Sequence, residues 1–301
     1  MRLRPVLISA AVTLLFALGA WVGGLWSVWQ VPLNRVPSIT WIGVVGGMLL
    51  SYSLRAWRIR REFAEVAGLS GWLSLRIVLT HTALVNLLPM RSGELGFPWL
   101  MRRALQVSWL DASASLLWLR LQDACVLTTL ALWVWPHWPI EQRLALTLAL
   151  WIAVLCGIHL VRRHGTQPLG ERSSGLALLT QALSQRGQRL WQGWLITTAN
   201  WALKLTVQAW LLAELLQVTL TTAWAGSVGA ELSALLPLQG LGGVGSYEAG
   251  SAAALRWHGV AWADGLQAAL SMHLCLLACS LGFGFLAWWL PRPLVSRHNP
   301  G

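Results

Sequence analysis

The stretch that decides the fold is Leu235-Leu236-Pro237-Leu238-Gln239-Gly240-Leu241-Gly242-Gly243-Val244-Gly245-Ser246-Tyr247-Glu248, which lies between two apolar runs. Proline removes a backbone donor and glycine adds backbone entropy, so a continuous helix is unfavourable here. Ser246 can cap a new helix, and Glu248 then lies in its first turn, where the helix dipole favours an anion. The stretch therefore predicts two helical arms joined by a break, with structural breakpoints at Pro237, Gly240 and Gly245. At Gly242 and Gly243 we expect the backbone to contact a ligand.

A second break with the same pattern lies at Asn86-Leu87-Leu88-Pro89-Met90-Arg91-Ser92-Gly93-Glu94. Leu-Leu-Pro followed by Ser-x-Glu occurs in both stretches, and Pro89 and Pro237 are about half a chain length apart. Paired interrupted segments at matching positions of two halves are typical of a binding site near the midplane of a membrane. The alternative is a pair of polar surface loops with ordinary turn residues. We favour an internal duplication, with breakpoints at Pro89 and Gly93 in its first half.

Composition indicates a polytopic membrane protein. The 301 residues are 56% hydrophobic and 11% charged, whereas a soluble domain has about 25% charged residues. The net charge of +11 does not indicate nucleic acid, because the basic residues cluster between apolar runs, as the positive-inside rule describes. The four cysteines lie in apolar runs without metal-ligand spacing, so we expect no metal, no cofactor and no disulfide framework.

The apolar runs predict an all-α fold with about six spanning helices and two re-entrant helical hairpins. The N-terminal run resembles a signal peptide but continues too far, so it is interpreted as an uncleaved first span. The second arm of the first hairpin, residues 95–101, reaches only about 10 Å, a third of the hydrocarbon thickness, and cannot cross. The expected spans are residues 5–27, 39–57, 109–135, 144–161, 191–216 and 266–290, and the hairpins are 72–101 and 222–258.

We expect a single transmembrane domain over residues 1–301, built from two halves of opposite orientation. The first half is 39–135, the second is 191–290, and a cytoplasmic amphipathic segment, 162–190, lies between them. Most of the 22 basic residues, Arg55 and Arg58 among them, then lie on the cytoplasmic side. Both termini are expected in the cytoplasm, and the plasma (inner) membrane is the expected location.

Six ionisable residues are expected within the membrane, at Arg91, Glu94, Arg120, Asp123, Lys204 and Glu248. Each costs roughly 2.5 to 3.5 kcal/mol in hydrocarbon, so such residues usually face a cavity and pair. Arg120 and Asp123 are three residues apart and can neutralise each other on one helix face; the alternative is a pair that only fixes helix packing. Lys204 either faces the cavity or extends its amine toward the interface.

Glu94 and Glu248 are the central candidates. Two capped half-helices that enter from opposite sides would direct their positive ends and carboxylates toward a common centre. That centre could hold a phosphate-bearing headgroup through backbone N–H groups and Arg91, or carry a proton on a buried carboxylate. The alternative is that each glutamate caps its own helix. His81 and His273 are interpreted as isolated core histidines.

The patterns Asn86-x-x-Pro89-x-Arg91-x-Gly93-Glu94, Arg120-x-x-Asp123 and Pro237-x-x-Gly240-x-Gly242-Gly243-x-Gly245-x-x-Glu248 occur in this order. Together they resemble the lysylphosphatidylglycerol synthase transmembrane-region family, also called flippase-like membrane proteins. The resemblance covers the chain from about the second span to the last. It implies an inner-membrane protein that moves or handles lipids, such as aminoacylated phosphatidylglycerol, other phospholipids or glycolipids.

Three functions follow as hypotheses. The first is a lipid translocator, not an enzyme, whose headgroup path is formed by residues from both hairpins and the spans beside them: Asn86, Arg91, Glu94, Arg120, Asp123, Lys204, Gly242, Gly243 and Glu248. The second is a membrane-embedded enzyme acting on a lipid phosphate, although the sequence pairs no nucleophile with a base. The third is a non-transporting partner of a lipid-modifying enzyme. Membrane lipids are the expected ligands, and the oligomeric state is left open.

Overall fold

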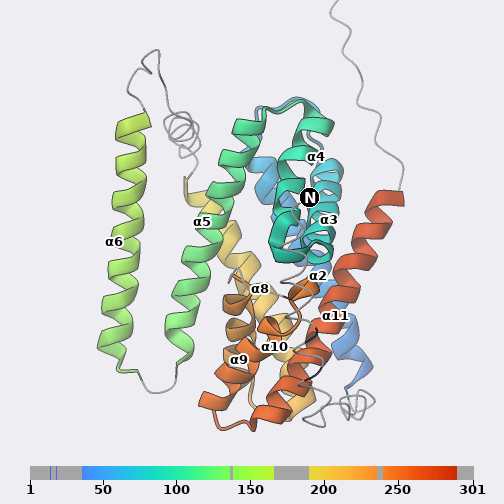
Figure 1. The fold of residues 1–301 in the computed structure, drawn as a ribbon. Coiled ribbons are helices and arrows are strands. Elements are labelled where there is room, and N and C mark those ends of the chain that lie inside the picture. Colours follow the sequence, from blue (N-terminus) through green and yellow to red (C-terminus); the bar gives the residue numbers. More distant parts are fainter. Residues whose placement is uncertain are drawn as a thin grey trace, which may run out of the picture.

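The computed structural model describes residues 36–135, 138–165, 190–235 and 240–289, together with Leu14 and Leu18. Every regular element within these residues is a helix (Figure 1), which confirms the expected all-α class. The expected first span, the segment between 166 and 189, and Pro237 lie outside the described residues. The elements are α2 (Ser38–Glu62), α3 (Gly71–Leu87), η3 (Pro89–Leu95), α4 (Gly96–Leu105), α5 (Trp109–Val134), α6 (Ile140–Gly165), α8 (Leu190–Leu216), α9 (Leu220–Ser233), η5 (Leu241–Gly243), α10 (Ser246–Trp257) and α11 (Trp262–Trp289).

Four of the described helices, α2, α5, α6 and α11, are long and apolar enough to cross a membrane. A fifth span is added if α8 and α9, which meet at an angle of 118°, are counted together. A helix of 25 residues is about 38 Å long, which exceeds the roughly 30 Å of a bilayer's hydrocarbon core. These helices give the chain the architecture of a multi-pass membrane protein.

Two helical hairpins occupy opposite ends of the bundle. The hairpin of α3 and α4 lies in the upper part of Figure 1, the hairpin of α9 and α10 lies in the lower part, and their breaks approach each other between. Glycine allows close packing inside the second hairpin, since a Cβ on Gly250 would overlap the carbonyl oxygen of Gly229. In the first hairpin, a Cβ on Gly93 would overlap the backbone of Leu84. In each hairpin, two helices thus fold back on each other across a break.

The starts of the two return arms differ from the sequence-based expectation. Helix α10 begins at Ser246, but its N-cap is Gly245 and not the serine. In the first hairpin, Pro89 opens a 3₁₀ helix that includes Glu94, and α4 begins only at Gly96. The expectation of a serine-capped half-helix is thus wrong for both hairpins, because a left-handed glycine and a 3₁₀ turn make the two chain reversals.

Equivalent elements of the two halves run in opposite directions. In Figure 1, α2 and α11 run upward, whereas α8 and α5 run downward. Corresponding pairs of helices are also in contact. Helix α2 contacts α3, and α8 contacts α9; likewise α11 contacts α3, and α5 contacts α9. At the centre α2 packs on α8, where Gly43 faces Trp210 and Gly47 faces Val207. Small residues of this kind allow membrane helices to approach closely.

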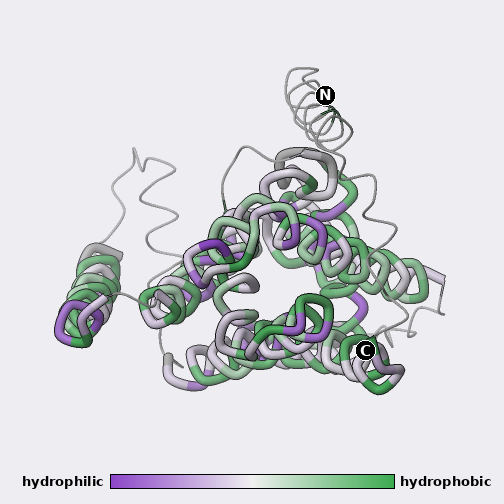
Figure 2. Tube along the Cα trace, turned by 90° about the horizontal axis from the view of Figure 1, so that it is seen from below, coloured by the Kyte–Doolittle hydropathy of each residue, from purple (hydrophilic) through white to green (hydrophobic). Residues whose placement is uncertain are grey.

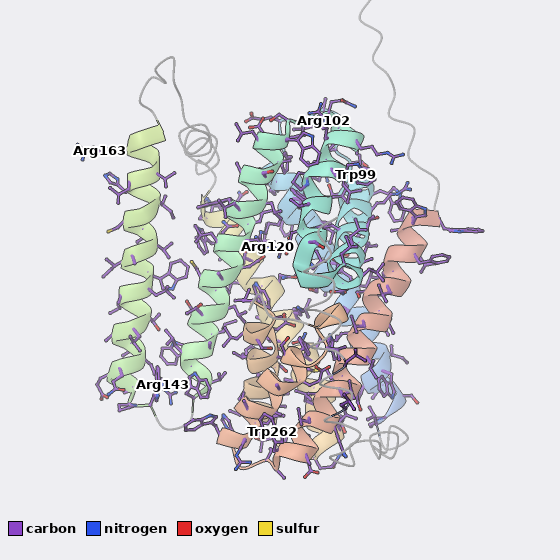
Figure 3. The ribbon with its side chains drawn as sticks, in the orientation of Figure 1. Trp99, Arg102, Arg120, Arg143, Arg163 and Trp262 are labelled. Atoms are coloured by element: carbon purple, nitrogen blue, oxygen red, sulfur yellow. The ribbon has the colours of Figure 1, made fainter. Side chains whose placement is uncertain are left out.

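Helix α6 lies apart from the other described helices in two perpendicular views (Figures 1 and 2) and contacts α5. Its apolar side chains point outward, and Leu148 and Leu155 are each more than half exposed. In Figure 3, Arg102 and Arg163 lie at one end of the molecule and Arg143 and Trp262 at the other. Arg120 lies between these ends, at mid-height (Figure 3).

Candidate functional site

A cavity of about 550 Å³ lies between the two hairpins. Pockets for small ligands typically have volumes of about 300 to 1,000 Å³. Its walls come from both halves of the chain and include the backbone of the second break at Gly240, Gly242 and Gly243. The polar side chains that line it are Ser51, Tyr52, Arg55, Thr82, Asn86, Glu94, Ser113, Arg120, Asp123, Asn200, Lys204, Glu231, Tyr247 and His273.

The first half lines the cavity with a chain of alternating charges. Arg120 contacts Glu94 of the first break at 2.8 Å and Asp123 at 3.2 Å. Asp123 also accepts a hydrogen bond of 2.6 Å from the buried Arg58 of α2 and one of 3.2 Å from the indole of Trp201. The expected pairing of Arg120 with Asp123 is confirmed, and it extends to Glu94 on one side and Arg58 on the other. This network joins the hairpin to α2, α5 and α8.

The second half lines the cavity with a separate cluster around Lys204. Its amine lies 2.7 Å from Glu231 of α9 and 5.0 Å from the centre of the Trp201 ring. Glu231 accepts further hydrogen bonds from Gln208 at 2.7 Å and from the Tyr247 hydroxyl at 3.1 Å. Lys204 therefore faces the cavity in an ion pair and does not extend toward the interface.

Glu248, at the second break, is fully buried behind the cavity wall. Its carboxylate accepts a hydrogen bond of 2.7 Å from the Gly245 N–H and lies 2.6 Å from Nδ1 of His273 in α11. Tyr247 stacks on the same imidazole, with ring centroids 4.2 Å apart. His273 is a buried core histidine, as expected, but it is not isolated, because Glu248 is its acidic partner. The alternative that Glu248 caps its own helix is confirmed.

His81 also has an acidic partner. Its Nε2 lies 3.4 Å from Glu94, and its ring faces Phe97 at a centroid distance of 5.6 Å. The interpretation of this histidine as isolated is wrong for the same reason as for His273. Spacing along the sequence could not show either pairing, because the partners lie on different elements.

The glycines of the second break have a backbone that other residues adopt only with strain. Gly242, Gly243 and Gly245 have φ angles of 66°, 88° and 96°, in the left-handed region that Cβ disfavours. Gly242 also lies against the backbone oxygen of Asn86, so that the two breaks touch. The Asn86 amide donates to Ser280 of α11 at 2.7 Å. Arg91 lies in η3, but its side chain is outside the described part of the chain.

Three charged residues of the site were not expected there from the sequence. Arg55 and Arg58 were counted as cytoplasmic, but α2 continues to Glu62, so that Arg55 lines the cavity and Arg58 is buried beside it. Arg55 donates to the Thr82 hydroxyl at 3.1 Å. Glu231 was missed, although a lone carboxylate in the apolar run of α9 is a usable signal for an intramembrane functional residue.

Scans of the sequence against protein-family models and curated proteins, and of the fold against solved structures, each found no match. The geometry itself is that of a charged cavity inside a helix bundle whose outer surface is apolar. Among the described residues, no cluster of three or more His, Cys, Asp or Glu side chains could hold a metal ion. The cavity suits a polar ligand that is bound through guanidinium, ammonium, amide and carboxylate groups.

Proposed function

We propose that this chain is a flippase-like lipid translocator of the bacterial inner membrane. In this proposal a phospholipid or glycolipid headgroup passes through the cavity between the hairpins while its acyl chains remain in the bilayer. The observation that carries the proposal is the cavity of about 550 Å³, lined by charged residues of both halves. Ionised side chains are expensive in hydrocarbon and mark pathways for polar substrates. The resemblance to flippase-like membrane proteins supports the same function.

The proposed topology has six spans and two re-entrant hairpins that enter from opposite sides, with both termini in the cytoplasm. The return arms support it, since α4 has 10 residues and α10 has 12, about 15 and 18 Å of helix, too short to cross. The opposite directions of equivalent helices support an inverted duplication (Figure 1). Irregular backbone is tolerated at membrane depth where it lines a cavity, as Gly242 and Gly243 do.

In the proposed mechanism, polar groups of the cavity replace water around the headgroup during its passage. Glu94 and Arg120 lie on the wall, with side chains 21% and 29% exposed, and exchange their mutual contact for contacts with the headgroup. Glu248 and His273 hold the second break in place behind the wall. The proposal contains no enzymatic step, no cofactor and no nucleic acid.

A non-transporting partner of a lipid-modifying enzyme is the second candidate. The observation that favours it is α6, whose apolar face is exposed along the helix and which packs on α5. Such a face suits another membrane helix as well as lipid. Transport measured on the purified chain separates the two candidates, because an accessory partner would move no lipid by itself.

The test is transbilayer movement of labelled phospholipids in liposomes that hold the purified protein. We expect movement with the wild-type chain and a decrease of roughly tenfold or more, or about 1.4 kcal/mol of barrier, with Glu94→Gln and with Glu248→Gln. Glu141→Gln is the matched control, because this carboxylate lies exposed in the first turn of α6, away from the cavity. Equal rates for all four proteins, or no movement of any phospholipid or glycolipid, would overturn the proposal.

A further inference from the structure

Residues that are 149 positions apart occupy equivalent places on α2 and α8. The hydrogen bond of 2.7 Å between Ser51 and Asn200 joins two such positions across the centre of the molecule. One turn further along the same helices lie Arg55 and Lys204, with the same separation. Their partners, Thr82 on α3 and Glu231 on α9, have it as well. The contact of Arg55 with Thr82 is thus the counterpart of the contact of Lys204 with Glu231.

The two counterpart contacts differ in charge. Lys204 has a carboxylate oxygen at 2.7 Å, whereas Arg55 has only a hydroxyl oxygen at 3.1 Å. The Thr82 hydroxyl donates its proton to the Val78 carbonyl at 2.8 Å, so its oxygen is left to accept from Arg55 and to orient the guanidinium. The first half therefore has a cation at a place where the second half has an ion pair.

The nearest carboxylates are occupied by other cations. Asp123 accepts from Arg58, Arg120 and the Trp201 indole, and Glu94 is bound by Arg120. Within the described part of the chain, this side of the cavity has three guanidinium groups for two carboxylates, and no carboxylate forms an ion pair with Arg55. A guanidinium has five N–H donors, and for Arg55 the described residues accept one hydrogen bond, at Thr82.

We infer that Arg55, oriented by Thr82, is an anion-binding site of the cavity and that its ligand is the phosphate of a phospholipid headgroup. A half-buried cation without a counter-charge is costly, and a phosphate oxygen supplies that charge. The planar fork of arginine matches a phosphate through two parallel hydrogen bonds. The choice of a lipid over free phosphate rests on the proposed function, whereas the anion site itself does not.

The test is a binding titration of the purified full-length chain in uncharged detergent with dihexanoyl phosphatidylglycerol. Dihexanoylglycerol, which lacks the phosphate, and inorganic phosphate are titrated alongside. We expect wild-type protein to bind the phospholipid at least tenfold more tightly than dihexanoylglycerol. Arg55→Gln, which removes the charge, should weaken phospholipid binding by tenfold or more.

Thr82→Glu is the decisive variant, because it gives Arg55 the carboxylate that its counterpart Lys204 already has. Thr82→Glu keeps the Arg55 guanidinium in place, so it tests the site even if Arg55→Gln does not fold, and it should also reduce phospholipid affinity tenfold or more. Thr82→Val keeps the size without adding charge; it removes the hydroxyl that orients Arg55 but supplies no counter-charge, so it should weaken phospholipid binding less than Thr82→Glu does. Wild-type affinity in Thr82→Glu, or in a folded Arg55→Gln, would overturn the anion site.

The source of the phosphate and the proposed transport are tested separately. Binding of inorganic phosphate without binding of the phospholipid would overturn the lipid ligand. Transbilayer movement that persists without Arg55-dependent binding would overturn this inference and leave the proposed function standing. Arg55-dependent binding without transbilayer movement would do the reverse, supporting the site and overturning the translocator.

Discussion

Both hairpins are pairs of helices joined by a break, but they hold their glutamates differently. Glu94 at the first break has a side chain that is 21% exposed and contacts Arg120 from α5, the helix that follows the hairpin. Glu248 at the second break is fully buried and contacts His273 from α11, the helix that follows its own hairpin. Each carboxylate thus has a basic partner on the next helix, but only the first is open to the cavity.

This difference concerns the two breaks, since Lys204 and Glu231 of the second half also line the cavity. In the first half the charges lie on the cavity wall, where a ligand can exchange with an existing partner. In the second half Glu248 is tied to the backbone of Gly245 as well as to His273, so its function is to fix the break. In the proposed function, the first break therefore takes part in binding, whereas the second break supports the cavity.

Removing Asp123 should have the largest effect on stability and sharpens the comparison of the two ion-pair networks. Asp123→Ala leaves the Arg58 side chain, which is 6% exposed, without its carboxylate. We expect a loss of about 3 to 5 kcal/mol in the free energy of unfolding, measured by chemical denaturation in detergent micelles. Glu231→Ala in the second half should cost less, because Lys204 is 23% exposed. Equal losses would remove this distinction between the halves.

Neutralising the two hairpin glutamates compares them directly. Glu248→Gln replaces a fully buried charged hydrogen-bond acceptor and should cost about 1.5 to 3 kcal/mol. Glu94→Gln acts on a partly exposed pair and should cost less than about 1 kcal/mol. Thermal unfolding of both variants in the same detergent gives the ranking. A larger loss for Glu94→Gln would contradict the supporting role assigned to the second break.

Glycine substitutions test whether both hairpins depend on close backbone contact. Gly250→Ala and Gly93→Ala each place a Cβ against backbone atoms of the opposite arm and should cost about 1 to 3 kcal/mol. Gly46→Ala is the control, because no atom beyond its own stretch of helix lies within 4 Å of its Cβ position. Melting temperatures measure the differences. If the control falls as much as the two hairpin variants, close packing of the arms is not the cause.

The smallest effect is expected where the halves meet. Ser51→Ala leaves the Asn200 oxygen, in a residue that is 4% exposed, without its donor and should cost about 1 kcal/mol. Ser53→Ala is the control, because Ser53 bonds only within its own helix, to the Leu49 carbonyl. Urea denaturation in mild detergent measures the free energy of unfolding of the two variants and shows whether they differ. A loss for Ser53→Ala equal to that for Ser51→Ala would show that the contact between halves adds nothing.

The sequence predicted what depends on neighbours along the chain. The expected start of α5 at Trp109 and the existence of a break in each hairpin follow from apolar runs and from glycine and proline, and the structure has them, although α9 ends at Ser233, before the expected breakpoints. The pairing of Arg120 with Asp123 follows from helical spacing. All of these are local features, which the chain encodes within a few turns.

Contacts between distant elements could not be predicted in this way. Whether His273 reaches Glu248 depends on the packing of α11 on α10, which no local pattern encodes. Arg55 was assigned to the cytoplasm because the distribution of basic residues indicates the side of the membrane on which a segment lies, and not how deep a residue lies within it. In addition, α2 continues past the end of its apolar run. The cap at Gly245 was misassigned because serine is the usual choice, whereas here the required φ of 96° favours glycine.

Helix α6 makes few contacts with the other described helices, yet in the proposed topology it determines how the two halves are oriented relative to each other. In the proposed topology the chain crosses the membrane three times, in α2, α5 and α6, between the start of α2 and the start of α8. Because three is odd, α8 starts on the face opposite to the one where α2 starts, and the second half is inserted upside down. Deleting α6 would make the number even and the two halves parallel. We therefore expect the length and hydrophobicity of α6 to be conserved in evolution, while the identity of its individual residues varies.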